Sequence, residues 1–181
     1  MTLVEQILAL DQALTAGGIP HAFGGALALA YAVEEVRATM DIDCNVFVAP
    51  ARVDAVFAAL PPEVTRTPED RVAVGRDGQG RLWWERTPVD LFFSYHRFHD
   101  VAAARVQLHP LAGQRLPFLS PTDLVVFKAF FSRPKDWVDI ATIVAAGSAD
   151  TDEALSWVRT LLGDDSDAAR RLAEVVAPAP I

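Results

Sequence analysis

The sequence predicts an α+β fold in which a small mixed sheet with flanking helices is followed by a C-terminal helical part. Up to residue 119, short segments in which apolar residues alternate as in a strand are interspersed with segments in which apolar residues recur every three or four positions, as in a helix. From residue 120 onward, only helical spacing occurs. A length of 181 residues suits one domain with a helical appendage. We therefore expect a core over residues 1–119 and a helical part packed on it over residues 120–181.

The first third of the chain alternates helices with short strands. In chain order we expect a helix at 2–16, a strand at 19–23, a helix at 25–35, a strand at 40–48 and a helix at 51–60. Glycines Gly17 and Gly18 end the first helix, since glycine favours helix C-termini. The prolines Pro61 and Pro62 end the third, because proline cannot continue a helical hydrogen-bond ladder.

The middle third is expected to be mostly strands. Strands near 71–75 and 80–86 flank the segment RDGQG, which is typical of a hairpin turn. The remaining elements expected here are a strand at 89–93, a short helix at 97–104, and strands near 105–109 and 115–119.

The segment from Ser120 to Asp123 is a strong helix start. Serine at the N-cap, proline at the first helical position and an acidic residue two positions later each favour a helix N-terminus. Helices are expected at 121–131, 135–146, 151–162 and 166–176.

Charge, cysteine content and hydropathy exclude several classes of protein. The net charge of −8 argues against broad, non-specific coating of nucleic acid, although a local basic patch remains compatible with a nucleic-acid substrate. The single cysteine, Cys44, excludes an internal disulfide framework. The N-terminus reads as an amphipathic helix without the basic start of a signal peptide, and no apolar run is long enough to cross a membrane. We expect a cytoplasmic protein without membrane contact.

The pair Gly24-Gly25 stands between an apolar strand and a helix. Glycine permits close approach of the backbone to a ligand, and a helix N-terminus offers free amide groups to anionic phosphates. A glycine pair alone is most often a simple turn. Its position here predicts a phosphate-binding turn.

Two acidic residues in one predicted strand are candidate metal ligands. In the segment RATMDID, Asp41 and Asp43 lie on one face, because residues two apart on a strand share a face. Like charges in this position repel unless a cation lies between them. We therefore predict a divalent cation, with solvated acids of an edge strand as the alternative. Thr39 is on the same face, and Arg37 is expected to face phosphate.

A third acid, Asp90, interrupts the apolar strand PVDLFF. A buried carboxylate needs a partner. A metal shared with Asp41 and Asp43 would supply it, and three acids suit the two-cation arrangement of phosphoryl and nucleotidyl transfer. The alternative partner is an arginine, Arg81 or Arg86.

Lys128 is the only charge in LVVFKAFF, and Asp136 and Asp139 share a face of the next helix. A lysine that faces a cleft is a natural contact for a triphosphate. A structural ion pair between the two helices is the alternative. Trp83 and Trp84 project from opposite faces of a strand, so that one ring is a candidate surface for stacking a base.

These motifs together resemble a known group of enzymes. The glycine pair, RATMDID, PVDLFF and SPTDLVVFKAFFSRPKDWVDI are similar to the nucleotidyltransferase superfamily with a polymerase-beta-like fold, over about residues 19–145. Their order resembles the AbiEii/MenT-type group, which are toxins of toxin–antitoxin systems.

The resemblance implies roles for individual residues. Asp41 and Asp43 would be metal ligands, and either Asp136 or Asp139 would be a late catalytic acid. The residues implied to hold nucleotide are Gly24, Gly25, Arg37 and Lys128. The wider superfamily often has Gly-Ser where this chain has two glycines, and the hydroxyl of Thr39 would then replace the missing contact.

The expected function is a Mg²⁺-dependent nucleotidyltransferase that transfers NMP from an NTP to an acceptor. The resemblance implies the 3′ end of tRNA as acceptor, a block of translation as the result, and a protein antitoxin as partner. Two alternatives remain at this point. One is transfer to a small molecule such as an aminoglycoside, or to a protein hydroxyl. The other is a non-catalytic module that binds nucleotide or protein.

Overall fold

The computed structural model describes residues 1–35 and 38–177, which form two compact units. One unit comprises residues 1–27 and 38–119 and holds the sheet. The other comprises residues 28–35 and 120–177 and is helical.

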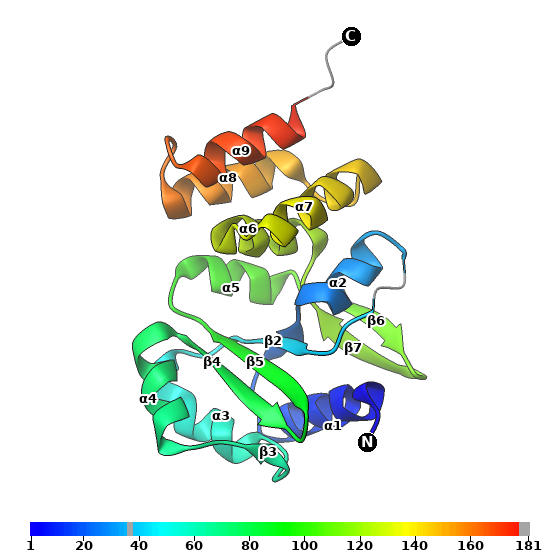
Figure 1. The fold of residues 1–181 in the computed structure, drawn as a ribbon, viewed down its shortest axis with the longest axis vertical. Coiled ribbons are helices and arrows are strands. Elements are labelled where there is room, and N and C mark those ends of the chain that lie inside the picture. The colour runs from blue at the N-terminus through cyan, green and yellow to red at the C-terminus, as the bar shows by residue number, and fades with distance from the viewer. Residues whose placement is uncertain (36–37, 178–181) are drawn as a thin grey trace. The chain divides into compact units, whose positions relative to one another are not determined.

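The sheet of the first unit is mixed, as predicted. Its order is β3-β4-β5-β2-β1-β7-β6. The strands are β1 (His21–Phe23), β2 (Ile42–Val46), β3 (Val64–Thr65), β4 (Gln79–Trp84), β5 (Thr87–Phe93), β6 (Gln107–Leu111) and β7 (Gln114–Phe118). The pairs β2–β5 and β1–β7 are parallel, and the other neighbours are antiparallel. This arrangement places β2 and β5 side by side at the centre of the sheet (Figure 1).

One face of the sheet forms the core of this unit. The side chains of Ile42, Cys44 and Val46 are fully buried, as are those of Leu91 and Phe93 on β5. Helix α1 (Leu3–Ala16) contacts α3 (Val53–Ala59), which follows a 3-10 turn at Pro50–Arg52, and both lie on the same side of the sheet (Figure 1). Because strand side chains alternate, the residues between the buried ones project from the opposite face.

The strand predicted near 71–75 is wrong. These residues belong to helix α4 (Pro68–Asp77). Thr67 and Asp70 form a capping box, in which each side chain accepts a hydrogen bond from the other's backbone amide, and Pro68 occupies the first turn. Gly78 ends the helix with a φ of 67°. The local helix signals therefore outweigh the valine-rich strand pattern.

The hairpin in this region consists of β4 and β5, so its turn lies at residues 85–86 and not in the predicted RDGQG segment. Glu85 adopts a φ of 55°, which the tight turn requires. The two-residue strand β3 was not predicted. Helices α2 (Gly25–Ala32) and α5 (Arg97–Ala104) are confirmed, α2 being shorter than expected.

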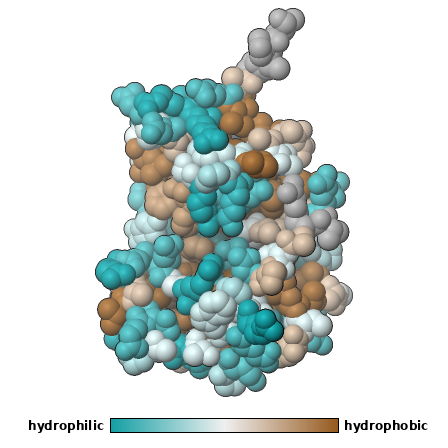
Figure 2. All heavy atoms as spheres, viewed as in Figure 1, coloured by the Kyte–Doolittle hydropathy of each residue, from teal (hydrophilic) through white to brown (hydrophobic). Residues whose placement is uncertain are grey.

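The helical unit contains α6 (Pro121–Phe131), α7 (Pro134–Ala146), α8 (Thr151–Leu162) and α9 (Asp167–Val176), close to the predicted bounds. Ser120 caps α6, and its hydroxyl accepts a hydrogen bond from the amide of Asp123. On the face shown in Figure 2, hydrophilic side chains gather over α8 and α9. Among residues 1–35 and 38–177, no helix is both long and apolar enough to span a membrane.

Candidate metal and nucleotide site

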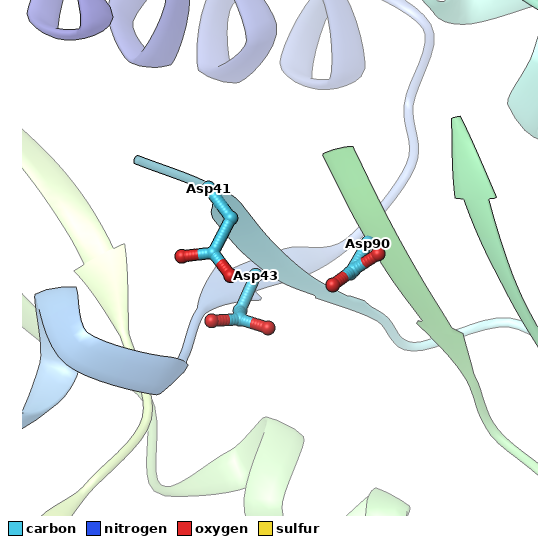
Figure 3. Close-up of side chains that lie close together, drawn as sticks. All are labelled: Asp41, Asp43 and Asp90. Carbon is cyan, nitrogen blue, oxygen red and sulfur yellow. The ribbon is translucent and has the colours of Figure 1, made fainter. Parts of the chain in front are cut away.

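Asp41, Asp43 and Asp90 form an acidic cluster on one face of the sheet. Asp43 lies opposite Asp90 in the parallel β2–β5 pair, and Asp41 directly precedes β2. Each residue offers a carboxylate oxygen, and these three oxygens lie within 4.8 Å of one another. Figure 3 shows the three side chains converging from the two strands. The pairing register therefore brings together the three acids that the sequence proposed as metal ligands.

The donor set of this cluster fits a hard divalent cation. All three donors are carboxylate oxygens, the ligands that Mg²⁺ prefers. The three residues are half-buried, so water is only partly available to screen their mutual repulsion. A bound cation would relieve this repulsion.

Two neighbouring side chains already hold the carboxylates in place. The hydroxyl of Thr39 donates a hydrogen bond of 2.6 Å to Oδ1 of Asp41. Thr39 therefore lies on the carboxylate side, as predicted. Arg81 donates two hydrogen bonds of 2.7 Å, from Nε and Nη2, to the two oxygens of Asp90.

Asp90 has the arginine partner that the sequence offered as an alternative to a shared metal. Arg81 and Asp90 face each other across the antiparallel β4–β5 pair, so the predicted arginine partner is present while Asp90 remains part of the cluster. The hydrogen bonds and charge of Asp90 raise the pKa of Arg81, and the charges of Asp41 and Asp43 add to the effect. Arg81 thus supplies positive charge to the whole cluster.

The glycine pair lies directly against Asp43. The amide of Gly24 donates a 2.9 Å hydrogen bond to the carbonyl oxygen of Asp43. Gly25, the first residue of α2, has a φ of 52°, and a Cβ atom there would lie 1.8 Å from Oδ2 of Asp43. Only glycine fits this approach. The N-terminus of α2 therefore lies beside the acidic cluster.

Sequence reasoning did not single out Asn45. Its Nδ2 lies 3.0 Å from the position of a Cβ on Gly24, and the residue is buried. Asn45 follows Asp41 and Asp43 at the same two-residue spacing, and this spacing could have predicted that Asn45 projects from the same face as the acids. Arg37, predicted to bind nucleotide, lies outside the described residues.

Lys128, Asp136 and Asp139 lie together in the helical unit. Nζ of Lys128 is 2.7 Å from Oδ2 of Asp139 and 3.7 Å from Oδ1 of Asp136. Asp136 also accepts hydrogen bonds from the amide and guanidinium of Arg133. The ion pair between the two helices that the sequence offered as an alternative is therefore present. A nucleotide role for these residues remains a prediction.

The charge state of Asp136 is set by opposing effects. Burial disfavours its charged form, but hydrogen bonds and charge from Arg133, together with the charge of Lys128, leave its pKa below the ordinary value. Asp136 is fully buried, so its carboxylate depends on these partners.

Comparison with known proteins identifies the fold. No family model matches the sequence, and no curated protein matches it significantly. A crystal structure of ANT(2'')-Ia in complex with adenylyl-2''-tobramycin is similar with a TM-score of 0.60 at 14% identity, covering 89% of this chain and 97% of that one. A solution structure of the antibiotic-resistance factor ANT(2'')-Ia has a TM-score of 0.55 at 16% identity, covering 96% and 88%.

A third similar structure is an antigenic nucleotidyltransferase-like protein from Paracoccidioides brasiliensis. Its TM-score is 0.54 at 16% identity, and the likeness covers 93% of this chain and 92% of that one. At these identities the likeness defines the fold alone. The chain thus has a nucleotidyltransferase-like α+β fold, as the resemblance implied.

Replacing Gly25 with alanine should disrupt the contact with Asp43. A Cβ there meets the carboxylate and the residue would keep a positive φ, so we expect a loss of about 2–4 kcal/mol in the free energy of unfolding. Urea denaturation measures this loss. Gly75→Ala is the control, because nothing lies within 4 Å of its added Cβ, and it should be neutral or stabilising. Equal stability of the two variants would contradict the packing described.

Replacing Asp136 with asparagine should destabilise the protein by about 2–4 kcal/mol at neutral pH, since a buried charged network loses its central negative charge and one of two acceptor oxygens. Because the folded-state pKa of Asp136 is lowered, the stability it contributes is present above its unfolded pKa. That contribution is lost as the pH falls below about 4 and through the folded-state pKa. The stability of Asp136→Asn should therefore depend less steeply on pH in this acidic range.

Chemical denaturation at several pH values measures the difference between Asp136→Asn and wild type. The matched control is Asp167→Asn, whose exposed carboxylate pairs with Arg170. Its effect should stay within about 0.5 kcal/mol, because exposed ion pairs contribute little. An Asp136→Asn effect as small as that of the control would refute a stabilising role for the network.

Proposed function

We propose that the protein is a magnesium-dependent nucleotidyltransferase, which transfers the NMP part of an NTP to an acceptor hydroxyl and releases pyrophosphate. The observation that carries the proposal is the cluster of Asp41, Asp43 and Asp90, with carboxylate oxygens within 4.8 Å of one another, beside the glycine start of α2. The nucleotidyltransferase-like fold supports it.

Each part of the site has a proposed task. The three carboxylates hold Mg²⁺, which when bound stabilises charge on the transferring phosphoryl group and on the attacking oxygen. The backbone amides at the N-terminus of α2, which begins at Gly25, bind the phosphates of the NTP, since a helix N-terminus favours anions. The amide of Gly24 is bonded to Asp43, so Gly24 contributes its lack of a side chain and not a donor. Thr39 orients Asp41 through its 2.6 Å hydrogen bond and offers its oxygen beside the phosphates.

Further nucleotide contacts are proposed from the resemblance. Arg37 precedes the two acids by a few residues in the sequence, and Lys128 carries a buried ammonium group between two carboxylates. Asp136 or Asp139 would then position that ammonium group. An ammonium group is a suitable contact for a triphosphate.

The proposed acceptor is the 3′ end of tRNA, and modification of that end would block translation. This rests on the sequence resemblance to AbiEii/MenT-type toxins, which also implies a protein antitoxin as partner. The guanidinium of Arg81 supports a nucleic-acid acceptor, because it places an exposed positive charge next to the acidic cluster on a protein of net charge −8.

A small molecule is the second candidate acceptor. The similar structure of ANT(2'')-Ia contains adenylyl-2''-tobramycin, and that likeness covers 97% of the ANT(2'')-Ia chain. An aminoglycoside is a polycation, so the acidic cluster and the acidic chain as a whole would attract it.

Transfer is tested by incubating the protein with Mg²⁺, each labelled NTP in turn, and either tRNA or tobramycin. We expect label on tRNA, and we expect Asp43→Asn to lower the rate at least about a hundredfold through loss of charge stabilisation at the phosphoryl group. The melting temperature of Asp43→Asn should not fall, because one of three repelling charges is removed.

Asp54→Asn is the control for the loss of an acid, since Asp54 is exposed and pairs with Arg71 outside the acidic cluster. It should transfer at the wild-type rate. Label on tobramycin instead of tRNA would favour the small-molecule acceptor. Wild-type activity in Asp43→Asn would refute the assignment of this acid as a metal ligand.

A further inference from the structure

A large aromatic side chain is exposed close to the acidic cluster. Trp83 on β4 is 47% exposed, whereas its neighbour Trp84 is fully buried. Strand alternation explains the difference, because Leu82 and Trp84 point into the core while Arg81 and Trp83 project from the other face. Trp84 therefore packs in the core, whereas the exposed ring of Trp83 is available to bind a ligand.

The pairing register places Trp83 on the same face as the acids. Asp43 lies opposite Asp90, and Asp90 lies opposite Arg81. Trp83 is two residues further along β4, which corresponds to about 7 Å. The indole therefore projects from the sheet next to the ion pair between Arg81 and Asp90.

The residues that flank Trp83 leave its ring accessible. Pro88 is its partner on β5 and Thr65 its partner on β3. Both side chains are small, and Thr65 is exposed. A half-exposed tryptophan between small neighbours presents a flat apolar surface, and such surfaces often bind ligands.

The order of the strands places Trp83 and the glycine turn on opposite sides of the acids. The strands β1, β2, β5 and β4 are neighbours in that order. The glycine start of α2 follows β1, Asp43 and Asp90 lie on β2 and β5, and Arg81 and Trp83 lie on β4. In an in-line displacement, the attacking and leaving oxygens are on opposite sides of the phosphorus. If the glycine turn holds the leaving phosphates, the attacking hydroxyl approaches from the β4 side.

We propose that Trp83 is the stacking platform for the acceptor, on which the nucleobase next to the attacking hydroxyl lies. This inference rests on the proposed nucleotidyltransferase function and adds the surface that selects the acceptor. An indole ring stacks on a planar base irrespective of its identity. The exposed guanidinium of Arg81 adds positive charge for the phosphate of the same nucleic-acid end.

Binding of a fluorescein-labelled RNA trinucleotide, CCA, measured by fluorescence anisotropy, tests the platform directly. Trp83→Ala should raise the Kd for this probe about 5- to 100-fold, while the Kd for Mg-NTP stays the same. Trp83→Phe should restore most of the affinity, because a smaller aromatic ring still stacks. Val72→Ala removes an exposed apolar side chain on α4 and serves as the control, with no expected change.

The remaining outcomes overturn the assignment. Unchanged probe affinity in Trp83→Ala, or no binding of the probe to the wild type, would refute a nucleobase platform. A loss of Mg-NTP affinity alone would place the base of the NTP on Trp83. A loss of tobramycin affinity alone would assign the ring to a sugar acceptor.

The test separates this inference from the proposed function. Asp43→Asn should lower the transfer rate at least about a hundredfold yet bind the trinucleotide with wild-type affinity. Loss of probe binding in Trp83→Ala together with full transfer by Asp43→Asn would refute the metal-dependent function and keep the platform. The reverse result would refute the platform alone. Thermal melts of Trp83→Ala and Trp83→Phe verify that both variants are folded.

Discussion

Mutual repulsion among three carboxylates on one sheet face is the constraint on which the rest of the site depends. Asp43 and Asp90 are fixed opposite each other by the β2–β5 pairing, and Asp41 lies just before β2. Such a cluster is unfavourable unless positive charge or donors surround it. Arg81 and Thr39 supply part of this compensation in the protein itself. A bound cation would supply the remainder, which is why we propose the cluster as a metal site.

The backbone of the glycine pair approaches the acids closely because glycine has no side chain. Gly25 leaves no room for a side chain between the start of α2 and the carboxylate of Asp43. The positive end of the α2 helix dipole therefore lies beside the acids, where it is electrostatically favourable. The glycine turn and the strand that carries Asp43 thus pack directly against each other within the sheet-containing unit.

Part of this site could be predicted from the sequence, because the two-residue spacing of Asp41 and Asp43 indicates that their carboxylates lie close together. The predicted strand included Asp41, whereas β2 begins at Ile42. The register that adds Asp90 depends on pairing between β2 and β5, in which Asp43 and Asp90 are more than 40 residues apart in the sequence. Arg81 joins through the local β4–β5 hairpin. The sequence could propose a shared metal or an arginine partner for Asp90 only as alternatives. For Lys128, local spacing was compatible with an ion pair and with a ligand contact, and the structure contains the ion pair with Asp139. Residues 71–75 were mispredicted because valines suit a strand, whereas the capping box of Thr67 and Asp70 decides for a helix.

Metal binding tests the central claim most directly. Titration of the wild type and of Asp41→Asn with Mn²⁺, followed by the paramagnetic resonance signal of the free ion, measures the affinity without any substrate. The account predicts that the wild type binds the ion and that the variant binds it at least about tenfold more weakly. Equal affinity of the two proteins, or no binding by the wild type, would contradict it.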